Sequence, residues 1–154
     1  MGVADGPRSK AEQLTLSTYV KLLRAAESIS ARAHQHLNRE KLSFSQFGVL
    51  EALYHLGPLV QRDLATKLLK SARNITMVVD NLEKRGLVLR VRSETDRRCT
   101  HIHMTPEGRL LLEKVFPQHV AGILQEMRVL SERELEQLGE FCRRLGKQPD
   151  RGNS

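Results

Sequence analysis

The sequence contains little of several features that mark common classes of protein. It has no tryptophan, four phenylalanines and two tyrosines in 154 residues, so we expect no large aromatic cage. Its two cysteines, Cys99 and Cys142, are too few for a disulfide framework. No apolar run approaches the roughly 18 residues of a membrane span, and the N-terminal segment lacks the apolar core of a signal peptide. We therefore expect a cytoplasmic protein with reduced thiols and no membrane contact.

Sequence motifs of catalytic and metal sites are missing as well. There is no nucleophile elbow, phosphate-binding loop or HExxH motif. His101 and His103 alternate on a predicted strand and share a face, whereas His34 and His36 lie two apart on a predicted helix and point in different directions. No Asp, Glu or Cys completes a tetrahedral ligand set at the usual spacing. We therefore expect no enzymatic activity, no metal site and no cofactor.

The chain has an excess of positive charge in its middle third. Its formal net charge is +7. Residues 61–98 contain ten lysines and arginines against five acids, so this segment alone has a net charge of +5. Such a concentration is typical of a nucleic-acid-binding surface. The alternatives are a solvated basic face with no partner and a face that docks an acidic protein.

The segment from Ser71 to Met104 predicts a helix followed by a β-hairpin. Ser71 is a favourable N-cap, and Gly86 suits a left-handed C-terminal stop. One face of the helix between them is apolar, with Ile75, Val78, Val79 and Leu82 at helical spacing. Residues 87–92 and 99–104 have strand composition, and the polar stretch between them suits an exposed hairpin tip.

A shorter helix from about Gln61, with Leu64, Ala65, Leu68 and Leu69 as apolar positions, precedes Ser71. Two helices joined by a tight turn, the second with a polar outer face, form a helix-turn-helix. Val60 stands where a Ser or Thr cap is usual, and the turn at Leu69 and Lys70 lacks glycine, so we expect mild strain there. The order of helix, helix and hairpin predicts a unit that binds double-stranded DNA, because the major groove admits an α-helix.

The remaining chain predicts four more helices. The first covers about residues 11–38. The second covers residues 44–56 and begins at a capping box of Ser43 and Gln46, with Phe47, Leu50, Leu53 and Tyr54 facing inward. The third begins at Thr105 and Pro106 and contains Pro117, where we expect a kink. The last begins at a capping box of Ser131 and Glu134 and ends at Gly146.

Apolar stripes on the first and last two helices exceed what the small helix-turn-helix unit can cover. We therefore expect a symmetric homodimer that spaces two reading helices about 34 Å apart, which matches an inverted repeat in DNA. The predicted fold class is mainly α with a small β-hairpin wing. Residues 11–146 form one domain, with dimerisation helices at 11–40 and 106–146 and a winged helix-turn-helix lobe at 44–104. Residues 1–10 and 147–154 are expected to be a disordered N-terminus and a flexible tail.

From about Leu16 to Gly146 the sequence resembles the MarR family of bacterial transcription regulators. The specific motifs are Ile75–Val88, the sequence Asp96-Arg97-Arg98, and Met104–Gly108, which matches a Leu-Thr-x-x-Gly pattern. The resemblance implies a triangular homodimer that binds palindromic operators. It places the helix of Ser71–Arg85 in the major groove and a wing arginine in the minor groove.

The resemblance also implies roles for individual residues. Arg73, Asn74 and Thr76 are the expected base readers, while Ser71, Lys70 and Arg62 contact phosphates. Met77 and Lys84 lie on the same groove face, where Met77 either touches a thymine methyl or is simply exposed. Arg97 or Arg98 enters the minor groove, and Asp96 ties the wing to its lobe. For Asp80 we expect a structural role, orienting Arg73 or Lys84, in preference to accepting from cytosine.

Residues 68–80 and 116–119 most resemble the MhqR-like branch of the family, whose namesake is a hydroquinone-responsive repressor. This suggests a repressor of stress, detoxification or efflux genes, released by a small phenolic or quinone-like ligand. The residues expected to line its pocket, unless they are plain core aromatics, are Tyr19, Phe44, Phe47, His55 and Phe116. The alternatives are a winged-helix interaction module and a redox- or metal-responsive regulator. Family members that sense peroxide have a cysteine in the first helix, and this chain has none there. We expect Cys99 and Cys142 to be small core residues.

Overall fold

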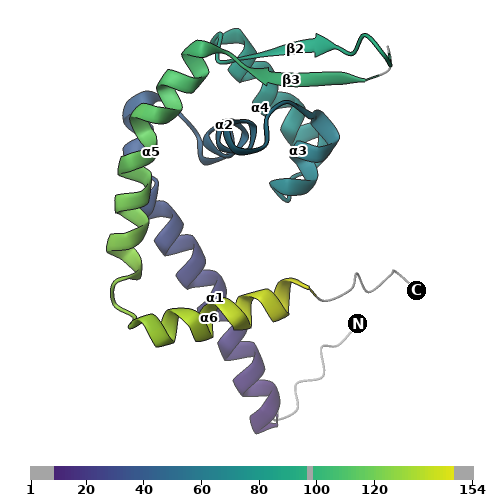
Figure 1. The fold of residues 1–154 in the computed structure, drawn as a ribbon. Coiled ribbons are helices and arrows are strands. Elements are labelled where there is room, and N and C mark those ends of the chain that lie inside the picture. The colour runs from purple at the N-terminus through teal and green to yellow at the C-terminus, as the bar shows by residue number, and fades with distance from the viewer. Residues whose placement is uncertain (1–8, 97–98, 148–154) are drawn as a thin grey trace, which may run out of the picture.

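The computed structural model describes residues 9–96 and 99–147 and confirms a mainly α fold with a β-hairpin wing (Figure 1). A lobe contains the short helices and the hairpin. The long helix α5 (Pro106–Met127) leaves this lobe and runs alongside part of α1 (Lys10–Ala33). Helix α6 (Glu132–Gly146) begins near the far end of α5 and crosses α1 in the view of Figure 1. The lobe consists of α2 (Phe44–Leu56), β1 (Leu59–Val60), α3 (Gln61–Lys67), α4 (Ala72–Lys84), β2 (Val88–Arg92) and β3 (Thr100–Met104).

The first helix begins and ends earlier than the sequence suggested. Ser9 caps it in a capping box with Glu12, so the helix begins at Lys10. It ends at Ala33, and residues up to Asn38, which we expected to continue it, enter the 3-10 helix Gln35–Glu40. The change of geometry places Leu37 fully inside the core. Burying that side chain stabilises the fold more than further turns would stabilise a helix that has few buried contacts at its N-terminal end.

Helix α2 has the predicted bounds and the predicted capping box. Phe47, Leu50 and Leu53 are buried as expected, but Tyr54 is exposed, which corrects that prediction. Its ring lies 4.9 Å from the guanidinium carbon of Arg109, in a cation–π contact at the surface. The core joins α2 to the sheet and the flanking helices, and its largest fully buried side chains are Phe47, Leu37, Leu50, Leu64, Ile75, Leu82, Ile102 and Leu112.

The wing forms a three-stranded antiparallel sheet with the order β1-β3-β2. Strands β2 and β3 lie within one residue of their predicted bounds, and Gly86 has the left-handed φ of 69° expected of a helix stop. Strand β1 was not predicted. It has only two residues, and its pairing of Leu59 with Ile102 joins positions 43 apart in the sequence.

The start of α5 is fixed against the wing. Thr105 caps the helix by accepting from the amide of Gly108 at 3.1 Å, as predicted. Its own hydroxyl donates to the Gly86 carbonyl at 2.7 Å. The helix continues through Pro117 without ending. Its buried positions include Leu112, whereas Leu110 is exposed.

Long parts of α1 and α6 present apolar side chains to solvent. Helix α6 has no buried residue, although its apolar positions follow a helical period. Cys142 on this helix is exposed and Cys99 is only half-buried, so neither is the core residue that we expected. Exposed large apolar residues on the two helices are Leu14, Leu16, Tyr19, Val20, Leu22, Leu23, Phe141 and Leu145.

None of the described helices is both long and apolar enough to cross a membrane.

Candidate nucleic-acid interface

Helices α3 and α4 form the predicted helix-turn-helix, and the strain expected in its turn is present. Leu69 has a left-handed φ of 51°, which is unusual for a branched side chain. The turn is closed by the amide of Lys70, which donates to the Ala65 carbonyl at 3.0 Å. Because of this geometry the Leu69 side chain is 92% exposed instead of packing with Leu68.

Helix α4 divides sharply into a buried and an exposed face. Ile75, Val79 and Leu82 are fully buried against the lobe. Its N-cap is Ser71, whose hydroxyl oxygen accepts from the Asn74 amide at 3.2 Å. The predicted contact residues on the outer face of α4 are all exposed: Arg73, Asn74, Thr76, Met77 and Lys84. Apart from Met77 these residues are polar or basic, which suits a duplex groove.

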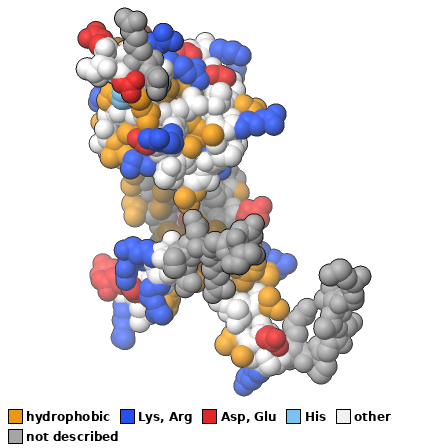
Figure 2. Space-filling model, turned by 90° about the vertical axis from the view of Figure 1, so that its right-hand side faces the viewer, with side chains coloured by type: hydrophobic (Ala, Val, Ile, Leu, Met, Phe, Trp, Pro, Cys, Tyr) orange, Lys and Arg blue, Asp and Glu red, His pale blue; other side chains and the backbone are white. Residues whose placement is uncertain are grey.

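Arg62 and Lys70, the expected phosphate contacts, are also exposed and lie on α3 and in the turn. They line a shallow hollow together with Thr66 and Leu69. Figure 2 shows several lysine and arginine side chains on one face of this lobe, among acidic and apolar ones. The structure thus brings most of the predicted contact residues to one end of the molecule.

Thr76 is fixed by two partners. Its hydroxyl donates to the Ala72 carbonyl at 3.0 Å in the preceding turn. Its oxygen accepts from Nε2 of Gln61, 2.6 Å away on α3. This contact joins the two helices directly through side chains, and periodicity alone had not suggested it.

Asp80 binds a different arginine from the one predicted. We expected it to orient Arg73 or Lys84, but its Oδ1 accepts from Nη2 of Arg90 on β2 at 2.6 Å. The Glu83 carboxylate also accepts two hydrogen bonds from Arg90, one from Nη1 of its guanidinium and one from its backbone amide at 3.1 Å. One strand residue therefore neutralises carboxylates on α4. Burial acts to lower the pKa of the Arg90 guanidinium, but the bonds to Asp80 and Glu83 outweigh it and raise the pKa.

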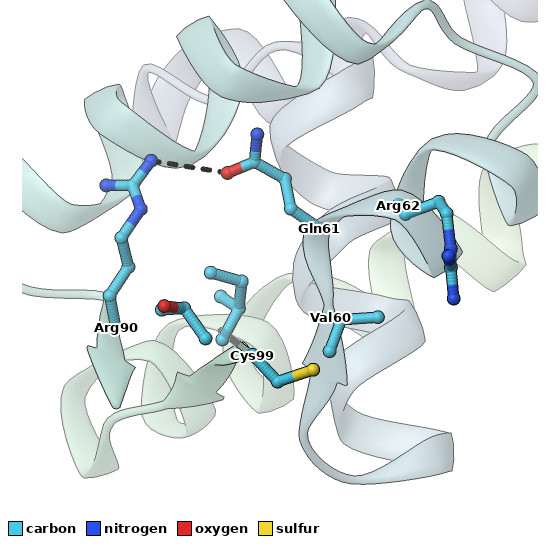
Figure 3. Close-up of a pocket in the computed structure, with 7 residues that line it drawn as sticks. Val60, Gln61, Arg62, Arg90 and Cys99 are labelled. Atoms are coloured by element: carbon cyan, nitrogen blue, oxygen red, sulfur yellow. Dashed lines mark hydrogen bonds between the residues drawn. The ribbon is translucent and has the colours of Figure 1, made fainter. Parts of the chain in front are cut away.

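The base of the wing and the start of α3 border a hollow of about 460 Å³ (Figure 3). Gln61 and Arg90 face each other across it, with Oε1 of Gln61 3.5 Å from Nη2 of Arg90. Arg62 and Cys99 also line this hollow. The hollow is open and lined by both polar and apolar side chains, and it separates the wing from the helix-turn-helix.

The described part of the wing tip is closed by hydrogen bonds around Asp96. The Cys99 amide donates to the Asp96 carbonyl at 2.9 Å, and the Cys99 thiol donates to its carboxylate at 3.4 Å. That carboxylate raises the pKa of the thiol, which disfavours the reactive thiolate. These contacts lie within the wing, so a tie from Asp96 to the lobe stays a prediction. Arg97 and Arg98 lie outside the described residues.

A second group of rings gathers around His119, where α5 meets α2 and the 3-10 helix. We call it the His119 cluster and define it by His34, His36, Phe44, Phe47, Phe116 and His119. The centroid of the His119 ring lies 4.3 Å from the ring centroid of Phe47 and 5.1 Å from that of His34. His34 in turn stacks on Phe44 at 4.1 Å. Phe116 and His36 lie 6.4 Å and 5.8 Å from His119.

Some of the residues predicted to line a ligand pocket lie in or beside the His119 cluster, and the pocket itself stays a prediction. Phe44 and Phe116 belong to it, and His55 reaches its edge, 6.0 Å from Phe116. Phe47 is fully buried and acts as a core aromatic. Tyr19 lies on the exposed half of α1, outside these ring contacts.

Sequence patterns did not predict that the histidines of the cluster come together. The spacing of His34 and His36 on a continuous helix predicted that they point in different directions. Both lie near His119 instead, because the helix ends at Ala33, before either of them. His119 is 7% exposed. Desolvation first, and then the nearby His34 and His36, lower the pKa of His119 to about 4. Within residues 9–96 and 99–147, no cluster of three or more His, Cys, Asp or Glu side chains has an arrangement suited to a metal.

Comparisons with known proteins agree with this geometry. A model of the MarR family matches residues 42–100. The HTH-type transcriptional regulator MhqR of Bacillus subtilis is 39% identical over 86% of this chain and 91% of its own length. A MarR-family regulator of Streptomyces coelicolor, solved in complex with DNA, is 27% identical with a TM-score of 0.80, covering 95% of this chain and 94% of that one. BpsR of Bordetella bronchiseptica, whose DNA binding is regulated by 6-hydroxynicotinic acid, is 25% identical with a TM-score of 0.81, covering 94% and 100%.

Proposed function

The chain belongs to the MarR family of DNA-binding transcriptional regulators, and we propose that it is a homodimeric repressor that a small phenolic or quinone-like ligand releases from an inverted-repeat operator. Regulators of this family bind DNA and are not enzymes. The proposal adds the dimer, the operator symmetry, the repression and the effector. It places the protein in the cytoplasm, where its DNA is.

The observation that supports the operator contact is the outer face of α4. Apart from Ala72 and Met77, its exposed side chains are polar or charged, and its buried side is packed into the lobe by Ile75, Val79 and Leu82. A helix held this rigidly presents its side chains in one orientation, as sequence recognition requires. We propose that Arg73, Asn74 and Thr76 face bases and that Ser71, Arg62 and Lys70 face phosphates. Met77 and Lys84 complete the groove face, and Arg97 or Arg98 enters the minor groove.

Selection of bound sequences from random duplex DNA by the purified protein tests the operator. We expect an inverted repeat with half-sites one duplex turn apart, because a two-fold dimer places its helices at that spacing. Binding with no preference above background at any salt concentration would favour a winged-helix module that docks an acidic protein.

Arg73→Ala separates base reading from phosphate contact. If Arg73 reads a base edge, its removal costs about 1–3 kcal/mol on the selected site and relaxes the preference at one position. A competition titration of selected and random duplexes measures both effects. An equal loss of affinity on the two duplexes would assign Arg73 to a phosphate.

The His119 cluster supports the effector part of the proposal. It lies where α5 joins the lobe, so a bound ring can change the position of the lobe relative to the long helices. Aromatic rings can serve as stacking partners for a small aromatic ligand, and the resemblance to the MhqR-like branch suggests a phenolic or quinone-like one. Release requires a ligand that prefers the non-binding arrangement, with a coupling free energy of about 1–3 kcal/mol. Calorimetric titration with methylhydroquinone and catechol, with and without operator, tests this coupling.

A further inference from the structure

Two hydrogen bonds decide what the Thr76 side chain can still offer to DNA. A hydroxyl has one proton and two lone pairs. The proton of Thr76 is directed to the Ala72 carbonyl, and one lone pair accepts from Nε2 of Gln61 at 2.6 Å. The side chain remains exposed on the outer face of α4. It therefore presents one free lone pair and a methyl group, and no donor.

Arg90 sets the direction of the bond between Gln61 and Thr76. Oε1 of Gln61 faces Nη2 of Arg90 at 3.5 Å (Figure 3), and a guanidinium cannot accept. The distance is long for a hydrogen bond. The positive charge nevertheless favours the amide oxygen, because the reversed amide would direct its N–H groups at a cation. Nε2 of Gln61 consequently faces Thr76.

The guanidinium is itself held in place from α4. Asp80 accepts from the same Nη2 atom at 2.6 Å, and Glu83 accepts from Nη1. The Arg90 side chain is 26% exposed, so solvent screens these contacts only in part. The chain of contacts begins and ends on α4, passing through β2 and α3.

We propose that Thr76 takes part in base selection as a hydrogen-bond acceptor, and that Arg90, acting through Gln61, is the positioning residue that holds the Thr76 oxygen in this orientation. In the major groove adenine and cytosine present amino groups that donate, whereas guanine N7 and O6 both require a donor. The base facing Thr76 is therefore selected as adenine or cytosine and against guanine. This inference rests on the proposed placement of α4 in the groove.

Selection from random duplexes with Thr76 variants of the full chain tests the acceptor. Thr76→Val preserves the shape but removes the lone pair. We expect the preference over guanine at one position of each half-site to fall about three- to tenfold, the value of one hydrogen bond. Thr76→Ser, the matched control, keeps the oxygen and the preference. Loss of the preference in Thr76→Ser as well would assign the contact to the methyl group and overturn the proposal.

Gln61→Leu and Arg90→Met test the relay, with thermal unfolding to show that each variant folds. Either change removes or releases the bond from Nε2 of Gln61 that holds the Thr76 oxygen in place, so the preference over guanine weakens at that one position. Arg90→Lys retains a cation and restores part of the discrimination. A purely structural Arg90 would lower affinity for every site equally and leave the base order unchanged, which would refute the relay. Should Arg90→Met not fold, Gln61→Leu decides.

The proposed function and the role of Thr76 can be refuted separately. If the wild-type protein selects no sequence at all, the proposed function is wrong. If it selects an operator but Thr76→Val leaves every base preference unchanged, only the role of Thr76 is wrong.

Discussion

His119 shows how a single side chain couples folding to pH. It is the only buried ionisable side chain among the described residues, and its Nδ1 has no hydrogen-bond partner among them. Its neighbours His34 and His36 are also ionisable, so any proton added to the cluster raises the electrostatic cost of another. Desolvation is the larger cause of the lowered pKa, and the two histidines add to it.

The free energy of unfolding should therefore fall as the pH falls from 6.5 towards 4. In this range the unfolded chain binds a proton at residue 119 that the folded chain, with its pKa of about 4, does not bind. The loss reaches at most about 3 kcal/mol. Denaturant unfolding at pH 7.5, 6 and 5 measures it. His119→Phe removes the group and should reduce the dependence on pH, and equal slopes for the two proteins would contradict this account.

At the scale of elements, the contact between α5 and the wing depends on the absence of a side chain at Gly108. A Cβ atom there would lie 2.1 Å from the carbonyl oxygen of Leu87. That oxygen also accepts from the Thr105 amide at 3.1 Å, so it cannot move freely. The first turn of α5 is consequently packed backbone against backbone on the chain just before β2.

Gly108→Ala should lower the free energy of unfolding by roughly 2 kcal/mol or more, because overpacking against backbone forces the elements apart. Gly139→Ala is the matched control. It is also helical, but no atom lies within 4 Å of the added Cβ, so we expect a gain of up to about 1 kcal/mol from helix propensity. Denaturant unfolding of both variants measures the difference. Equal stabilities would mean that α5 can shift without cost.

The wing is the second element whose contribution can be isolated. Arg98→Ala should weaken operator binding and reduce the slope of log K against log salt by about 0.9 per subunit, the value of one phosphate contact. Arg143→Ala is a suitable control, because this arginine is paired with Glu140 on α6, away from the lobe. Fluorescence anisotropy over a series of salt concentrations measures both slopes. An unchanged slope for Arg98→Ala would place that side chain off the duplex.

At the scale of the whole molecule, the exposed apolar residues of α1 and α6 require cover. Helix α6 alone presents Phe141 and Leu145, each more than half exposed, beside Leu135 and Leu138, which are partly covered. Contiguous apolar surface of this kind is typical of an interface between subunits. A second copy of the chain would cover it and set the distance between two α4 helices.

Phe141→Glu should therefore dissociate the dimer and lower operator affinity together, because one lobe alone engages only half of an inverted repeat. Leu56→Glu is the matched control. Leu56 is 53% exposed and Phe141 54%, but Leu56 lies at the end of α2 in the lobe. Sedimentation equilibrium, with and without operator, gives the mass of each. A wild-type protein that remains a single subunit on every duplex would refute the dimer.

The sequence by itself determined the starts of α2, α4, α5 and α6 and the division of α4 into two faces. Ser43 with Gln46 and Ser71 act on amides within three residues, and glycine at position 86 acts on its own backbone. Such signals are local, so they survive whatever surrounds them. The family motifs extend this to the arrangement of helices and wing, which is why the fold class was predicted correctly.

Only the tertiary structure decided which side chains contact one another at the candidate site and in the His119 cluster. Arg90 reaches Asp80, Gln61 reaches Thr76, and His34 meets His119, across separations of 10, 15 and 85 residues. Side-chain periodicity assigns a face to a residue but not the partner across from it. The partner depends on how helices and strands pack, and packing is fixed by the whole core at once.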